Sequence, residues 1–149
     1  MVINKKQTTK YAIIFTSLLL YIFSFTQDAF VVIDMNVEKV FSSLEILVMG
    51  SMAFLGGGLL EQLMWNANPL NFLTIVFFLM DKPLAVKTGL GALVLAALFL
   101  TWNEILVAES GRTAVITSLE WGYWLWLGSI ASLCIGVLWY FYRNRNVVE

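Results

Sequence analysis

Residues 122–142 read GYWLWLGSIASLCIGVLWYFY, and none of them carries a charge. A transmembrane helix needs about 20 consecutive apolar residues to cross the hydrocarbon core of a bilayer. Aromatic residues crowd both ends of this run, as they do in helices whose ends lie at the headgroup level of a membrane. The stretch therefore predicts a membrane-spanning helix over about 121–142.

Two further apolar runs support the same class of protein. Residues 11–25 carry no charge, and residues 84–102 carry only Lys87. The chain as a whole is 60% hydrophobic and 13% charged, whereas a soluble domain is about half apolar and about a quarter charged. This composition predicts an integral membrane protein, with the lipid bilayer as its first partner.

The nine cationic residues orient the predicted membrane protein. Seven of them lie at the ends of apolar runs: Lys5, Lys6, Lys10, Lys82, Lys87, Arg143 and Arg145. Lys39 and Arg112 lie elsewhere. Because basic residues near the ends of spans favour the cytoplasmic side, we expect a multi-pass membrane protein with both termini in the cytoplasm.

The expected fold is an all-α, four-crossing helical bundle in a single domain. Its spans cover about 10–28, 43–81, 84–103 and 121–142. The second span is expected to be broken near 56–71, where three consecutive glycines begin a polar stretch that contains Pro69. In the alternative, 43–64 and 69–81 each cross, which gives five spans and divides the cations four to five instead of seven to two.

A short β-hairpin is expected between the last two spans, on the periplasmic side. Residues 105–109 and 112–117 flank Ser110-Gly111, and runs rich in β-branched residues around a two-residue turn are typical of hairpins. The alternative is an irregular loop.

Glu61, Gln62, Asn66 and Asn68 form the candidate polar intramembrane site. Glu61 lies between apolar pairs, and a carboxylate at membrane depth usually faces a cavity or a partner. Broken helices with free backbone groups also form ion sites in many transporters. In the alternative, this region lies at the cytoplasmic interface, Glu61 is solvated, and the asparagines act as caps and turn residues around Pro69.

Gly128, Ser132 and Gly136 form a candidate helix-packing stripe in the last span, because residues four apart share one helix face. Small residues allow membrane helices to approach closely. Packing within one chain and packing between copies of the chain both fit this pattern.

Several classes of function are excluded by what the sequence lacks. The chain has no histidine and one cysteine, Cys134, so it has no His-based catalytic pair, no histidine ligand for haem and no disulfide framework. We find no phosphate-binding loop, and no acids with metal-ligand spacing. We therefore expect no enzyme activity and no catalytic, cofactor or metal site. No basic face for nucleic acid exists.

Two segments resemble known proteins. Residues 65–70 (WNANPL) and 122–129 (GYWLWLGS), with the basic turn at 82–87, resemble small bacterial multi-pass inner-membrane proteins that have no known activity. The resemblance covers about residues 44–142. It implies the inner-membrane location and brings no activity and no site residues.

Two functions fit these expectations. The first is a structural or accessory membrane subunit that self-assembles or binds another membrane protein. The alternative is a small oligomeric channel or transporter whose polar path is lined around Glu61.

Overall fold

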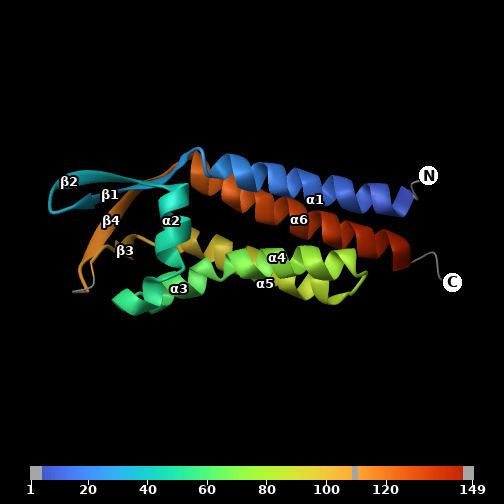
Figure 1. The fold of residues 1–149 in the computed structure, drawn as a ribbon. Coiled ribbons are helices and arrows are strands. Elements are labelled where there is room, and N and C mark those ends of the chain that lie inside the picture. The colour runs from blue at the N-terminus through green and yellow to red at the C-terminus, as the bar shows by residue number, and fades with distance from the viewer. Residues whose placement is uncertain (1–4, 109–110, 146–149) are drawn as a thin grey trace.

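The computed structural model describes residues 5–108 and 111–145, which form helices and one antiparallel sheet (Figure 1). In chain order the elements are α1 (Lys5–Ser24), β1 (Asp28–Asp34), β2 (Val37–Ser42), α2 (Ser43–Gly50), η1 (Ala53–Gly56), α3 (Leu59–Trp65), α4 (Ala67–Leu79), α5 (Leu84–Leu98), η2 (Phe99–Thr101), β3 (Glu104–Leu106), β4 (Thr113–Leu119) and α6 (Trp121–Arg145).

The molecule is elongated, with its longer helices at one end and its sheet at the other (Figure 1). Helices α1, α4, α5 and α6, here called the helical layer, pack as neighbours, most extensively α1 against α6 and α4 against α5. The start of α1, the α4–α5 turn and the end of α6 lie together at the end far from the sheet (Figure 1). We call these two ends the cation end and the sheet end.

The sheet begins with a tight hairpin. Strands β1 and β2 pair from Asp34↔Val37 to Asp28↔Ser42. The two residues between them, Met35 and Asn36, have φ angles of 50° and 63°. Two central residues with positive φ are the signature of a type I′ turn, whose twist matches that of the flanking strands.

The second edge of β1 pairs with a strand from the other end of the sequence. Strand β4 lies antiparallel to β1, with Phe30 opposite Leu119 and Ile33 opposite Val115. Strand β3 then adds to β4, which gives the order β2-β1-β4-β3. Phe30 and Val32 of β1 point from the sheet into a core that includes Phe99 and Tyr123, so the sheet rests on the ends of η2 and α6.

The expectation of an all-α bundle is wrong, because the chain folds as a mixed α and β protein with a four-stranded antiparallel sheet. Residues 28–42 were expected to be an acidic loop between spans, because they include Asp28, Asp34 and Glu38. The apolar residues between these acids bury one face of β1. A strand with one buried face is stable only when it pairs, and its partner β4 lies more than 80 residues away.

The segment expected to form a hairpin contributes β3 and β4, which pair antiparallel through Leu106↔Thr113. The connection is longer than a two-residue turn. The Val107 N–H donates to the Arg112 carbonyl at 2.9 Å, and Gly111 has a φ of 82°. Ser110 lies outside the described residues. Because β4 also pairs with β1, this hairpin is part of a larger sheet.

The four-crossing arrangement is also corrected. Within residues 5–108 and 111–145, two helical stretches are long and apolar enough to cross a membrane by length and composition, Leu84–Thr101 and Trp121–Asn144. The first part of α1 is polar and basic, and α4 has only 13 residues. Length and composition therefore single out α5 with η2, and α6.

Residues 43–81 form four separate helices. Helix α2 runs across the long axis of the molecule between the sheet and α3 (Figure 1), and η1 ends at Gly57, whose φ of 86° reverses the chain before α3. Glycine adopts this left-handed conformation without steric cost. We call α2, η1 and α3 the arm.

An ion pair joins three segments at the cation end. Helix α4 ends with Asp81 at a φ of 56°, where the Lys82 N–H donates to the Phe77 carbonyl at 2.9 Å, a Schellman-type helix end. This turn places Asp81 Oδ2 2.6 Å from Lys10 Nζ of α1. The Tyr140 hydroxyl of α6 donates to Asp81 Oδ1 at 3.2 Å. The Lys10 side chain is buried at 7% exposure, whereas that of Asp81 is 63% exposed, so the pair balances the Lys10 charge at the surface of the cation end.

Small residues bring α1 and α6 into contact. A Cβ at Gly136 would lie 2.5 Å from Ile13 of α1, so glycine is required there for close packing. The Ser17 hydroxyl of α1 donates to the Ser129 carbonyl at 2.9 Å. The rest of the predicted stripe makes no such contact: the Ser132 hydroxyl bonds within α6, and no described atom lies within 4 Å of a Cβ placed at Gly128.

Candidate functional site

A cavity of about 680 Å³ lies between the sheet, the arm and the sheet-side ends of the helical layer. Its walls include Phe30 and Ile105 from the sheet, Met64 from the arm, and Tyr123 and Trp126 from α6. Ligand sites are commonly cavities of about 300–1,000 Å³ with apolar walls and a few polar groups. We call this the sheet–helix cavity.

The mouth of the cavity runs along the arm. Among the residues that line it, Val48, Met49, Met52 and Leu55 are each more than half exposed. These four residues belong to α2, to η1 and to the link between them. The deeper walls contain the buried residues Phe30, Phe99 and Tyr123.

Trp65 fastens the two α-helices of the arm to each other. The Trp65 indole N–H donates to the Leu47 carbonyl of α2 at 2.8 Å. Its ring lies so close to α2 that a Cβ at Gly50 would stand 2.6 Å from it. A glycine at this position is therefore required by close packing, and it lets α2 and α3 fold back on each other.

Glu61 connects the arm to the edge of the sheet. Its Oε1 accepts a hydrogen bond of 3.0 Å from the Leu106 N–H of β3. Strand β3 is an edge strand, so this backbone donor has no neighbouring strand to pair with. Glu61 Oε2 has no hydrogen-bond partner among the described residues, and among these residues Glu61 is the only acidic or basic side chain that lines the cavity.

Asn68 is the most connected of the predicted site residues. Its Oδ1 accepts from the Tyr21 hydroxyl at 3.0 Å and from the Trp126 indole N–H at 2.8 Å. Its Nδ2 donates to the Trp65 carbonyl at 3.0 Å. With 6% of its surface exposed, Asn68 ties α1, α3, α4 and α6 together at the floor of the cavity.

Gln62 and Asn66 do not line the cavity. The Gln62 amide, oriented with its nitrogen toward α2, donates to the carbonyls of Gly50 at 3.0 Å and Ser51 at 3.2 Å. Asn66 ends α3, and its backbone N–H donates to the carbonyls of Gln62 and Leu63. The structure therefore brings Glu61 and Asn68 to one cavity and leaves the other two residues in helix-end roles.

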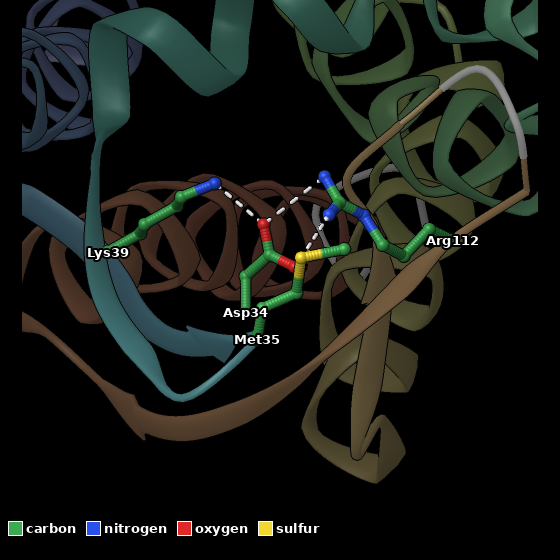
Figure 2. Close-up of polar contacts among 4 residues, drawn as sticks. All are labelled: Asp34, Met35, Lys39 and Arg112. Atoms are coloured by element: carbon green, nitrogen blue, oxygen red, sulfur yellow. Dashed lines mark hydrogen bonds and ion pairs between the residues drawn. The ribbon is translucent and has the colours of Figure 1, made fainter.

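A second polar cluster lies at the tip of the sheet, and sequence reasoning missed it (Figure 2). Asp34 Oδ2 is 2.6 Å from Lys39 Nζ and 3.4 Å from an Arg112 guanidinium nitrogen. Arg112 also donates to the Met35 sulfur at 3.0 Å. The sequence did contain an indication of this cluster, because Lys39 and Arg112 are the two cations that lie away from the ends of the apolar runs.

The Asp34 cluster shifts the ionisation of its carboxyl group. The hydrogen bond from Lys39 holds the pKa of Asp34 below its ordinary value, burial opposes this shift, and the positive charge of Arg112 adds to it. Asp34 Oδ1 and Arg112 Nε are buried and have no partner among the described residues. The cluster joins β1, β2 and the residue before β4, and the side chains of Lys39 and Arg112 stay partly exposed.

Neither a metal site nor a similar protein identifies the chemistry of the cavity. The described residues contain no group of three or more Cys, Asp or Glu side chains that could hold a metal ion. No family model matches the chain, no curated protein matches its sequence, and no solved structure matches its fold. The resemblance of residues 65–70 and 122–129 to inner-membrane proteins stays a prediction.

Replacing Asn68 with alanine should destabilise the fold strongly. The substitution leaves the Trp126 N–H and the Tyr21 hydroxyl without their shared acceptor, and buried donors that lose their partners typically cost about 1–3 kcal/mol each. We expect a loss of about 2–4 kcal/mol in unfolding free energy, measured by denaturant titration in mild detergent. Asn66→Ala is the control and should cost under about 0.5 kcal/mol. Equal effects would show that Asn68 does not have the connecting role described above.

Asp34→Asn should lower stability in a pH-dependent way. Because the folded pKa of Asp34 lies below its unfolded value, its ion pairs stabilise the protein fully above the unfolded pKa and lose this effect as pH falls through the folded pKa. The loss of stability caused by Asp34→Asn, relative to the unmodified protein, should therefore be largest near neutral pH and should shrink below about pH 4. The unfolding temperatures of the variant and of the unmodified protein, measured over a series of pH values, give this loss of stability. The exposed neighbour Glu38→Gln is the control, and a deficit that stays constant with pH would contradict the ion pair.

Proposed function

We propose that this chain is an integral protein of the bacterial inner membrane that serves as an accessory subunit. Helix α5 with η2, and helix α6, cross the bilayer, with the cation end in the cytoplasm. The sheet and the arm stand at the outer face, where the cavity opens. The chain has no catalytic role in this proposal, and its partners are lipid and either a second copy or another membrane protein.

The separation of charge between the two ends carries this proposal. All seven cations from the basic groups belong to the start of α1, the α4–α5 turn with the first turn of α5, or the end of α6. The acids of the described residues, apart from Asp81, belong to the sheet, the arm or the links beside them. Clustered basic residues at one end of apolar helices favour retention of that end in the cytoplasm.

The sides of the helical layer also support a membrane location. Large apolar side chains are exposed on all four of its helices, among them Tyr11, Phe15, Ile22, Phe72, Val76, Val94, Ile135 and Leu138. Soluble monomers rarely expose apolar surface over so many neighbouring elements. Lipid chains or the helices of a partner would cover these side chains.

The channel or transporter alternative was suggested by a polar path around Glu61, and the residues of that path make hydrogen bonds within the fold instead. Of its four polar residues, Asn68 uses both side-chain atoms in internal hydrogen bonds, and Gln62 bonds to α2. Glu61 holds the edge of the sheet. Gln62 and Asn66 lie outside the cavity that Glu61 and Asn68 line, and all these contacts stabilise the fold, so we propose the accessory function instead.

Single-cysteine labelling tests the orientation. In a Cys134→Ser background, Val37→Cys places a thiol on exposed β2 and Met80→Cys places one at the exposed cation end. With a membrane-impermeant maleimide on bacterial spheroplasts, we expect Val37→Cys to react at once and Met80→Cys to react only after lysis.

The two positions are each other's control because both are more than half exposed in the fold. Recovery of the chain in the soluble fraction would refute membrane insertion. Labelling of Met80→Cys in intact spheroplasts with protection of Val37→Cys would refute the orientation.

A further inference from the structure

We infer that the sheet–helix cavity binds an acyl chain of a membrane lipid whose head group carries a primary ammonium, with the ammonium paired to Glu61. The inference rests on the proposed membrane location, because the bilayer would supply the lipid. The binding itself is argued from the cavity. Three features of the described residues support it: the shape and lining of the cavity, the surface around its mouth, and its charges.

The cavity suits a flexible apolar chain. Its volume of about 680 Å³ lies within the range of small-molecule sites. Aromatic rings such as Phe30, Phe99 and Trp102 line it together with Met49, Met52 and Met64. Methionine side chains are unbranched and adapt to irregular apolar ligands, so the lining accommodates a chain without a defined shape.

The surface around the mouth points to the bilayer as the source of the ligand. Outside the residues that line the cavity, the arm also exposes Leu44, Phe54, Leu59, Leu60 and Leu63. Between residues 44 and 64 the only charged residues are Glu45 and Glu61. A mouth surrounded by apolar surface is unfavourable in water and is suited to contact with the apolar edge of a membrane.

The charges select an ammonium head group. Among the described residues, Glu61 is the only carboxylate of the lining, no lysine or arginine lines it, and Glu61 Oε2 is free of hydrogen bonds from these residues. An ammonium brings three donors and a positive charge. An anionic head group would meet this carboxylate with no cation to offset it, because Lys39 and Arg112 already pair with Asp34 at the tip of the sheet.

A second polar group lines the same cavity. Ser43, at the start of α2, is buried, and its hydroxyl has no hydrogen-bond partner among the described residues. Its oxygen has almost no accessible surface and packs against Gly122 of α6. Ser43 is therefore part of the packed wall, and Glu61 is the polar group that a head group can reach.

Native mass spectrometry of the purified, delipidated protein tests the inference. We would add equal amounts of phosphatidylethanolamine and phosphatidylglycerol with identical acyl chains. The unmodified protein should retain phosphatidylethanolamine in roughly threefold to tenfold excess, the size expected of one partly exposed ion pair. Glu61→Gln retains an acceptor for the Leu106 N–H, so it should fold, bind both lipids and lose the preference.

Two further variants make the result specific. Glu45→Gln removes a carboxylate from the same arm outside the cavity and should keep the preference. Ala53→Phe places a ring in the lining and should weaken binding of both lipids several-fold.

Equal retention of the two lipids by the unmodified protein, an unchanged preference in Glu61→Gln, or full binding by Ala53→Phe would each overturn the inference. Because binding is measured in detergent, the result is independent of the labelling experiment. A chain that labels in the proposed orientation but retains no lipid would refute the cavity inference alone.

Discussion

The pairing of β1 with β4 is the constraint on which the rest of the structure depends. It joins residues 30–33 to residues 115–119 through an antiparallel ladder. Because β1 follows α1 and β4 precedes α6, the ladder brings the sheet-side ends of these two helices together. Their packing continues along their length through the Ser17–Ser129 hydrogen bond and the contact of Ile13 with Gly136.

The cavity follows from how the sheet meets the helices. The sheet packs on Phe99 and Tyr123, and the chain must then travel from β2 at one edge of the sheet back to α4 in the helical layer. It does so through the arm, in which Trp65 joins α3 to α2 and Glu61 joins α3 to β3. Short helices joined by glycine turns cannot fill the space that they cross, so an apolar cavity remains beneath them.

The sequence predicted local features better than long-range ones. Apolar runs located the longest helices, the glycines at 56–58 indicated the break before α3, and the isolated Glu61 marked a residue of the cavity wall. The sheet was missed because its decisive pairs, such as Phe30 with Leu119, join distant segments. The roles of Asn68 and Asp34 depend on partners from other elements, which spacing along one helix or strand cannot indicate.

A disulfide between β1 and β4 tests the central pairing most directly. Ile33 and Val115 are directly opposed, and both are about half exposed at 44% and 50%. Opposed Cβ atoms lie about 4.5–5.5 Å apart, close to the separation that disulfides require. In a Cys134→Ser background, Ile33→Cys with Val115→Cys should cross-link rapidly under mild oxidation, and Ile33→Cys with Thr113→Cys should cross-link slowly. Failure of the first pair, or equal rates for both, would contradict the ladder and the fold built on it.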